Sequence, residues 1–303
     1  MMEQIKHAYL ILAHHEFDIL GRLLIALDHE QNDIFIHVDR KVGTLPQLAT
    51  RFAHLYVLEE RIDVRWGDVS VIEAELLLFE EAQKRGPYGH YHLLSGVDMP
   101  LRSQAEIHTF FNNHAGKLFI GFSAGDQSEQ ITRKVRRYHL FPRHFRTVSG
   151  TTGSIRRVIR FLGLRLQFLF AVYRHRAINF KKGTQWVSVT EPFVSYVLTQ
   201  KKHILAQYKM TFCADGIVLQ TLCWNSSFRA DIYDVALEGT GSQRLIRWKD
   251  NVLHDWGNDD FDELISANYM FARKFNSSQI EIVDRLLASI VPAKTNNELA
   301  HGE

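Results

Sequence analysis

The chain has 303 residues, of which 46% are hydrophobic and 23% charged, values typical of a globular protein with a sizeable core. A formal net charge of +2 is too small to indicate a nucleic-acid-binding protein. Two cysteines, Cys213 and Cys223, exclude a disulfide framework, and no Cys/His cluster has the spacing of zinc ligands. The composition therefore predicts a protein of a reducing compartment.

The N-terminal half alternates apolar runs with helical patterns. Residues 7–13 and 33–38 predict buried strands, and residues 17–27 carry apolar side chains at helical spacing. A strand, a helix and a strand at this spacing form a βαβ unit, which predicts a parallel nucleotide-binding sheet. Further along we expect strands at 55–58 and 117–122, and a helix at 69–84 that turns Leu76, Leu77 and Phe79 inward.

An apolar run that begins at Tyr91 stops abruptly at Ser95-Gly96-Val97-Asp98. In an open α/β sheet the ligand lies outside the carboxyl ends of the strands, so this loop predicts polar groups at the rim of a binding site. The alternative is an ordinary turn built from Gly96 and Asp98 and closed by Pro100.

The C-terminal half also mixes strand-like and helical segments. We expect a loop entering a strand at 182–189, a helix at 191–198 with Pro192 in its first turn, a helical run after Asp215-Gly216, a basic strand-like segment at 243–249, and a helix starting near Asp262.

Two segments are rich in basic residues. Residues 133–146 predict either a site for an anionic acceptor or a solvated face. Residues 155–178 mix apolar runs with arginines and are too short and too charged to span a bilayer. They predict either a basic amphipathic helix on an anionic membrane surface or a helical insertion packed on the core. The arginines do not share one helical face, which counts against the membrane-surface interpretation.

Four short motifs follow one another along the chain. They are His37-Val38-Asp39-Arg40-Lys41, Ser95-Gly96-Val97-Asp98-Met99-Pro100, Gly183-Thr184-Gln185-Trp186 and Ala272-Arg273-Lys274-Phe275. In this order, across about residues 7 to 290, the chain resembles the core 2 β-1,6-N-acetylglucosaminyltransferase and peptide O-xylosyltransferase family.

The resemblance implies an α/β fold of the GT-A type, with a mixed, mainly parallel central sheet covered by helices on both faces. It also implies a UDP-sugar donor, a glycan or glycolipid acceptor, and catalysis without a metal or other cofactor. Eukaryotic members have a Golgi membrane anchor, whereas this chain goes from Met1 almost directly into a strand-like run. We therefore expect a bacterial cytoplasmic enzyme, peripheral on the inner membrane if residues 155–178 bind lipid.

Finding no internal repeat or linker, we expect one domain at residues 1–293 and a disordered tail at 294–303. Residues 1–125 would form a nucleotide-binding half. Residues 126–293 would form an acceptor and diphosphate-binding half that includes the basic apolar segment.

Five residues are expected to bind the donor: Asp39, Arg40, Trp66, Arg273 and Lys274. The resemblance places Asp39 and Arg40 in the nucleotide pocket and Trp66 near the donor, and it brings Arg273 and Lys274 to the diphosphate, where positive charge holds the leaving group. The alternatives are a solvated Asp39 beside Arg40, a buried packing role for Trp66, and an ordinary surface pair of cations.

The catalytic base is where the chain departs from the family. Members carry a Glu five residues before a Thr, and counting back from Thr221 leads to Gly216. Its neighbour Asp215 is our candidate base, because Gly216 permits a backbone shift. Alternatively, Asp98 takes the role, or the protein binds a nucleotide sugar without transferring it.

Four residues are candidates for binding the acceptor or the donor sugar: Asp98, Gln185, Trp186 and Trp248. Trp248 matches a Trp of the family's acceptor site, and its alternative is a core position. Asp260-Phe261-Asp262 is the one Asp-x-Asp sequence, and we interpret it as a helix cap rather than a metal site. We expect no metal ligand.

Together these features predict an inverting, metal-independent transferase. It would move N-acetylglucosamine from UDP-GlcNAc to a sugar hydroxyl, forming a β-1,6 branch in a bacterial surface glycan. The alternatives are a xylosyl or other hexosyl transferase and a non-catalytic nucleotide-sugar-binding protein.

Overall fold

The computed structural model describes residues 5–146, 150–249 and 252–291. The predicted disordered tail, residues 294–303, lies outside the described residues. The division of the chain into one domain with two halves stays a prediction.

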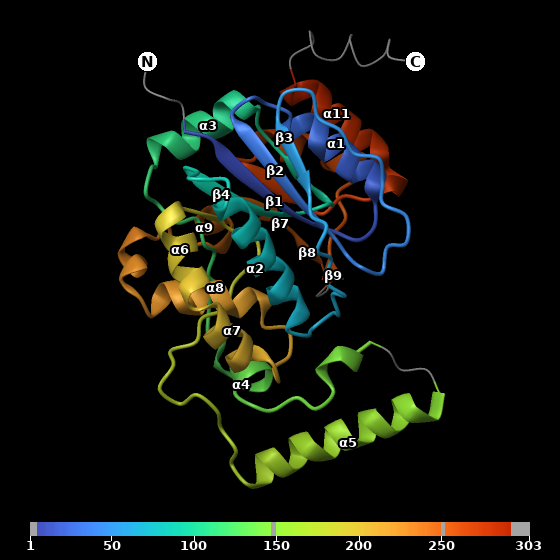
Figure 1. The fold of residues 1–303 in the computed structure, drawn as a ribbon, viewed down its shortest axis with the longest axis vertical. Helices are drawn as coiled ribbons and strands as arrows, with labels where there is room; N and C mark the ends of the chain where they lie inside the picture. The colour runs from blue at the N-terminus through green and yellow to red at the C-terminus, as the bar shows by residue number, and fades with distance from the viewer. Residues whose placement is uncertain (1–4, 147–149, 250–251, 292–303) are drawn as a thin grey trace.

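A five-stranded sheet with the strand order β3-β2-β1-β4-β6 forms the centre of the protein (Figure 1). Its strands are β1 (His7–Ala13), β2 (Asn32–Val38), β3 (His54–Val57), β4 (His90–Ser95) and β6 (Ser188–Val189). The first four are parallel and β6 pairs antiparallel with β4, so the predicted mixed, mainly parallel sheet is confirmed.

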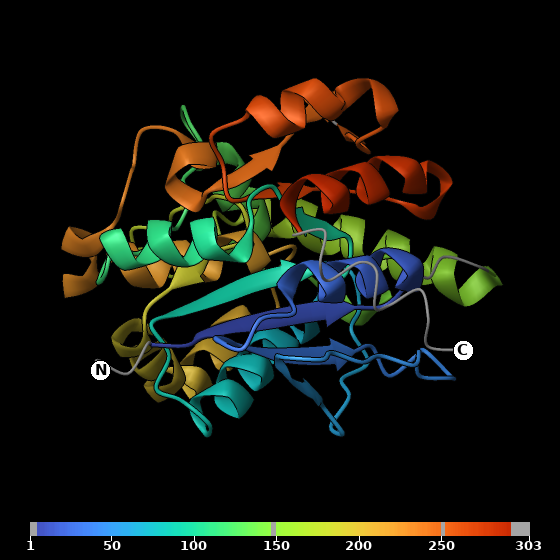
Figure 2. The same cartoon turned by 90° about the horizontal axis from the view of Figure 1, so that it is seen from above.

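Helices cover both faces of this sheet, as predicted (Figure 2). One face packs against α2 (Ser70–Gln83), α6 (Glu191–Thr199), α7 (Lys201–Tyr208) and α8 (Asp215–Trp224). The other packs against α1 (Phe17–Leu27), α3 (Gln104–Asn113), α10 (Phe261–Ser266) and α11 (Ile280–Ile290). Because β2 and β4 are buried on both faces, apolar residues run through them without strict alternation. On α2 the predicted inward residues Leu76, Leu77 and Phe79 are buried.

A second, three-stranded sheet has the order β5-β10-β7 and lies at the carboxyl end of β4. It consists of β5 (Asp98–Pro100), β7 (Arg244–Ile246) and β10 (Phe271–Arg273), and a small hairpin joins β8 (Trp248–Lys249) to β9 (Val252–Leu253). The predicted strand-like segment 243–249 is therefore split in two. The remaining elements are α4 (Ser128–Val135), α5 (Gly150–Leu169), α9 (Glu238–Ser242) and four 3₁₀ turns at Pro142–His144, Ser227–Asp231, Asn258–Asp260 and Ser277–Gln279.

The predicted strand at residues 117–122 is wrong. This segment makes only two isolated bridges, from Leu118 to Ile232 and from Phe119 to Ser188. Its side chains are buried as in a strand, but the neighbouring β6 has only two residues and offers no longer ladder.

Two glycines let distant backbone segments touch beside α8. The Gly183 amide donates a hydrogen bond to the Gly216 carbonyl at 2.8 Å. A Cβ atom at Gly216 would lie 2.3 Å from the Gly183 carbonyl oxygen, which is closer than any real contact allows. A glutamate therefore cannot occupy position 216 with this backbone packing.

Gly216→Ala should lower the free energy of unfolding by about 1–3 kcal/mol, because two backbone segments must move apart. Urea denaturation would measure this change. The control is Gly21→Ala on α1, where nothing lies within 4 Å of the added methyl group. That substitution should stabilise the helix by about 0.5–1 kcal/mol. A Gly216→Ala protein as stable as the wild type would contradict the close contact.

Candidate active site

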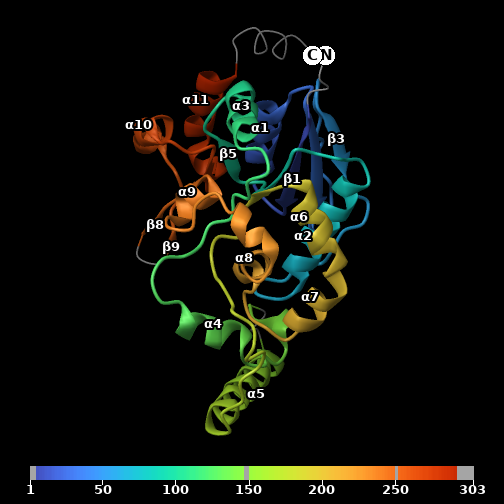
Figure 3. The ribbon, with the colours of Figure 1, turned by 90° about the vertical axis from the view of Figure 1, so that its left-hand side faces the viewer.

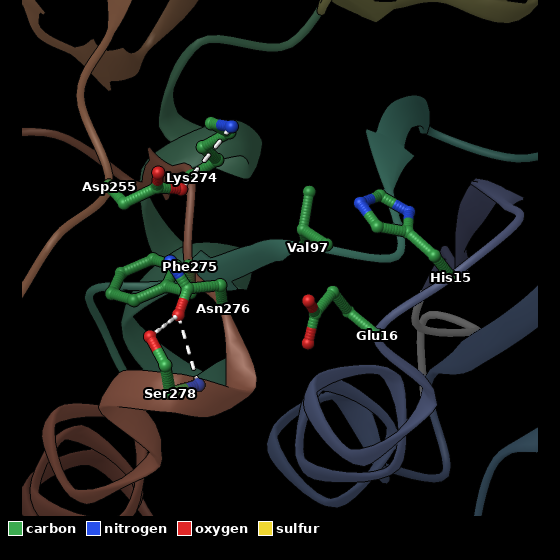
Figure 4. Close-up of a pocket in the computed structure, with 8 residues that line it drawn as sticks. All are labelled: His15, Glu16, Val97, Asp255, Lys274, Phe275, Asn276 and Ser278. Carbon is green, nitrogen blue, oxygen red and sulfur yellow. Dashed lines mark hydrogen bonds and ion pairs between the residues drawn. The ribbon is translucent and has the colours of Figure 1, made fainter.

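The central sheet reverses its strand order between β1 and β4, since β2 and β3 lie on one side of β1 and β4 on the other. Loops that leave the sheet at such a point diverge and form the ligand crevice of open α/β folds. Here the two loops are residues 14–16 after β1 and residues 96–97 after β4. Both contribute to a cavity of about 340 Å³ (Figure 4), which is within the size range of small-ligand sites.

The cavity carries charges of both signs. It is lined by His15, Glu16, Val97, Asp255, Lys274, Phe275, Asn276 and Ser278. The Lys274 ammonium lies 3.3 Å from an Asp255 carboxylate oxygen. Hydrogen bonds from Ser277 hold the Glu16 carboxylate and lower its pKa. Lys274 is thus the lysine that can meet an anionic group in this cavity.

Arg273 and Lys274 do not face the same space, in contrast to the expectation that they bind the phosphates together. The Arg273 side chain is only 12% exposed, with its Nε atom 3.7 Å from an Asp98 carboxylate oxygen. Its guanidinium lies 4.1 Å from the centre of the Trp186 ring. Arg273 is the last residue of β10 and faces Asp98 and Trp186, whereas Lys274 lies just beyond the strand and lines the cavity. The buried Trp256 holds this segment, because its indole N–H donates to the Arg273 carbonyl at 2.8 Å.

Asp98 is engaged within its own loop. Its carboxylate accepts hydrogen bonds from the Ser95 hydroxyl at 2.5 Å and the Ser95 amide at 3.0 Å, and it is 1% exposed. Together with the ion pair to Arg273, these contacts occupy most of its acceptor positions. The geometry favours a positioning role for Asp98 over that of the base.

Asp215 is the first residue of α8 and lies near a second acid, Glu75 on α2. Burial raises the pKa of Asp215, and the positive charges of Lys134 and Arg273 oppose the shift. Burial also raises the pKa of Glu75 well above its usual range, and the negative charge of Asp215 adds to the effect. The Asp215 charge therefore favours the protonated form of Glu75.

Sequence reasoning missed Glu75, although a signal was present. The residue lies between Ala74 and three consecutive leucines on a helix face that points inward, and it is 2% exposed. A glutamate on a buried face is rare unless it has a partner. Its partner is Gln185, whose amide N–H donates to the Glu75 carboxyl. Gln185 therefore contacts the acidic pair.

Asp39 follows β2, as predicted, and is 5% exposed. Its carboxylate accepts hydrogen bonds from the Lys41 amide at 2.9 Å and the Lys41 ammonium at 2.6 Å. Arg40 is exposed instead. The same ammonium reaches Asp63, whose pKa is lowered to about 2, chiefly by hydrogen bonds from Arg65.

Trp66 is 48% exposed, so the buried packing alternative is wrong. The Arg146 guanidinium lies 4.3 Å from its ring centre, and Phe212 packs on its edge. The next residue, Gly67, accepts a hydrogen bond from the Cys213 amide at 3.0 Å. This contact joins the Trp66 loop to the segment that carries Asp215.

Trp248 is 65% exposed on the β8–β9 hairpin, which rules out the core position. Asp260 occupies the N-cap position of α10, as expected, but its side chain makes no capping hydrogen bond there. Its carboxylate instead accepts from the Gly257 amide at 2.9 Å and from Arg247 at 2.8 Å, and Asp262 is exposed. In the described parts of the chain, no group of three or more His, Cys, Asp or Glu side chains could hold a metal ion.

A sheet that reverses its strand order at a cavity containing a lysine has the architecture of an open α/β fold with a ligand site at its switch point. The protein is an α/β glycosyltransferase with a GT-A-like nucleotide-sugar transferase fold. The model of one family, described as "Core-2/I-Branching enzyme", matches residues 7–264, and the chain belongs to this family.

Curated relatives are distant but align over most of the chain. The N-acetyllactosaminide β-1,6-N-acetylglucosaminyl-transferase of Mus musculus is 25% identical over 313 residues, which cover 96% of this chain and 74% of that protein. Xylosyltransferase 2 of Mus musculus is 26% identical over 320 residues, covering 96% of this chain but only 35% of that protein. The expected family resemblance is confirmed.

The described helices include none that is both long and apolar enough to cross a membrane.

Glu75→Gln should stabilise the protein increasingly as the pH rises. The unfolded chain loses the Glu75 proton near its ordinary pKa of about 4.5, whereas the folded protein retains it to higher pH. Wild-type stability therefore falls as pH rises from about 4.5 through the raised pKa, and an uncharged glutamine avoids this loss.

Thermal melts of both proteins across this pH range would measure the difference. The melting temperatures should agree near pH 4.5 and diverge above it. Glu73→Gln, on the same helix but at a partly exposed position, is the matched control and should show no such divergence. Parallel curves for wild type and Glu75→Gln would contradict a raised pKa at Glu75.

Proposed function

We propose that the protein transfers N-acetylglucosamine from UDP-GlcNAc to a sugar hydroxyl without a metal ion, inverts the anomeric centre and forms a β-1,6 branch. The observation that carries this proposal is the placement of Lys274 in the cavity at the switch point, with the neighbouring Arg273 turned inward and close enough to Asp215 for their charges to interact. The printed name of the mouse relative, a β-1,6-N-acetylglucosaminyl-transferase, supports the choice of sugar and linkage.

In this mechanism the donor spans the carboxyl edge of the sheet. Asp39, with its carboxylate steadied by Lys41, receives the uridine, and the exposed ring of Trp66 borders it. Lys274 compensates the charge on the diphosphate, which grows as the sugar departs. Arg273 contributes a second positive charge from behind the Trp186 ring. Arg40, which is exposed, remains a predicted donor contact at the rim.

Asp215 acts as the general base. It takes the proton of the acceptor hydroxyl while the hydroxyl oxygen attacks the anomeric carbon. The bond from that carbon to the diphosphate oxygen breaks, and UDP leaves with the bonding electron pair. A pKa raised by burial suits this role, because a base whose pKa lies closer to the operating pH accepts a proton more readily. A single displacement of this kind converts an α-linked donor into a β-linked product.

Glu75 and its partner Gln185 position the base. Burial and the Asp215 charge keep Glu75 protonated to higher pH, so Asp215 is the ionised acid and is free to accept the acceptor's proton. Glu75 would thus compensate in part for the glutamate that the family carries at the position of Gly216. Asp98 fixes Arg273.

The acceptor would lie against exposed aromatic surface. Trp248 is the exposed indole on the acceptor side, and the apolar face of a sugar can stack on it. Trp186 is 8% exposed and covered by Arg273, so its contribution would be to orient that guanidinium.

Two other functions remain as alternatives. The xylosyltransferase relatives favour a xylosyl donor in the same site. The glycine at position 216 favours a protein that binds a nucleotide sugar without transferring it. The bacterial surface-glycan role and the cytoplasmic location stay predictions.

Release of UDP from a panel of UDP-sugars in the presence of EDTA would test the proposal. We expect release from UDP-GlcNAc above the other donors. Asp215→Asn should reduce the rate by about 10²–10⁴, as expected for loss of a general base. Lys274→Ala should reduce it by about 10²–10³, as expected for loss of one charge contact to the leaving group.

Asp262→Asn and Lys209→Ala are matched controls at exposed positions and should retain the wild-type rate. Activity that requires added manganese and is lost in Asp262→Asn would overturn the metal-free mechanism. UDP binding without turnover, in the presence of sugar acceptors and unchanged in Asp215→Asn, would support the binding protein instead.

A further inference from the structure

Helix α5 stands apart from the rest of the fold (Figures 1 and 3). Within this 20-residue helix the one buried residue is Gly153. The alternative that the segment packs on the core is therefore wrong.

The helix is attached to the body by one polar edge. Arg160 donates to the Leu140 carbonyl at 3.1 Å, and Gln167 exchanges hydrogen bonds with the backbone of Tyr138 at 2.7 and 2.8 Å. Gly163 lies between them, and a Cβ atom there would come 3.0 Å from the Leu140 side chain. Positions 160, 163 and 167 share one side of a helix, so this side faces the protein.

The opposite side is apolar and faces solvent. Six residues form this outer stripe: Ile155, Val158, Ile159, Leu162, Leu166 and Leu169. Their exposed fractions range from 41% to 73%. In an ordinary surface helix the apolar stripe faces the core, so α5 is turned the other way. A contiguous exposed apolar surface of this kind marks an interaction site.

The charge around the stripe identifies the partner. Residues 130–190 contain fourteen Lys and Arg residues and no Asp or Glu. Arg157 and Arg165 are exposed on α5 itself. A second copy of the chain on this stripe would bring like charges together, whereas an anionic surface would neutralise them. Arg160 is bonded to the body and so does not belong to the free surface, on which Arg157 and Arg165 are exposed.

We propose that α5 lies on the surface of an anionic lipid bilayer, with the outer stripe in the boundary between headgroups and acyl chains and the arginines at the phosphates. A basic helix with an apolar face binds membranes in this way, and each basic residue near an anionic surface adds to the attraction. This contact does not depend on which sugar is transferred.

The contact would also set the orientation of the active site relative to the membrane. Arg160 lies 4.4 Å from the centre of the Phe145 ring, Phe145 packs on Phe212 at 4.6 Å, and Phe212 packs on Trp66. A chain of packed rings thus links α5 to the rim of the donor site. An acceptor carried by a lipid would be held near that rim.

Co-sedimentation with vesicles of phosphatidylcholine, with and without phosphatidylglycerol, tests the proposal. Wild type should sediment with the vesicles that contain phosphatidylglycerol. The triple variant Leu162→Gln, Leu166→Gln, Leu169→Gln should bind at least about 100-fold more weakly, because three apolar side chains lose their burial. The double variant Arg157→Gln, Arg165→Gln should bind about 30-fold more weakly.

The matched control is Val235→Gln, Leu237→Gln, which replaces exposed apolar residues outside α5 and should bind like wild type. Circular dichroism would establish that each variant is folded. Failure of wild type to sediment with either vesicle, or equal sedimentation with both, would overturn the proposal. So would a wild-type dimer in analytical ultracentrifugation that the triple variant abolishes, because a second copy would then cover the stripe.

Discussion

The ion pair between Arg273 and Asp98 is the interaction on which the arrangement of the site depends. Both side chains are largely removed from water, and a charge in that position needs a partner. The two residues are also register partners in the pairing of β10 with β5. Trp186 covers the guanidinium from the β6 side. One cation therefore joins the loop after β4, the approach to β6 and a strand near the C-terminus.

Close backbone packing is a second constraint, and it bears on the departure from the family. Gly183 and Gly216 touch so tightly that position 216 has no room for a side chain. The acid is found one residue earlier, at Asp215, and another is supplied from the opposite side by Glu75 on α2. Where the family carries a glutamate this chain has Gly216, and two acids from different helices, Asp215 on α8 and Glu75 on α2, lie near each other.

The bonds that attach α5 to the body determine which of its side chains face solvent. Its sequence mixes apolar residues with four arginines, and a helical projection alone leaves the arginines spread around the axis. Once Arg160 and Gln167 are bonded to the body, the free surface carries the apolar stripe and two exposed arginines, Arg157 and Arg165. If the leucines of α5 packed against the body, the same sequence would form an ordinary surface helix.

Much of the fold followed from the sequence alone. The buried runs of β1, β2 and β4 and the helical spacing of α1 and α2 are local patterns, because burial on both faces of a parallel sheet demands continuous apolar runs. Short ordered motifs identified the family and singled out Asp39, Asp98, Arg273 and Lys274. The prediction of a strand at 117–122 was wrong because the neighbouring β6 is too short to form a ladder with it. The length of that neighbour cannot be read from the sequence.

Only the tertiary structure decided which of these residues work together. It separated Arg273, which pairs with Asp98 in the interior, from Lys274, which lines the cavity. It paired the Asp39 carboxylate with Lys41 rather than Arg40, and it brought Glu75 near Asp215 across 139 intervening residues. The sequence determined the strands, the helices and the family. Burial and proximity, which determine pKa and the partners of each charge, depend on long-range packing and appear only once the chain is folded.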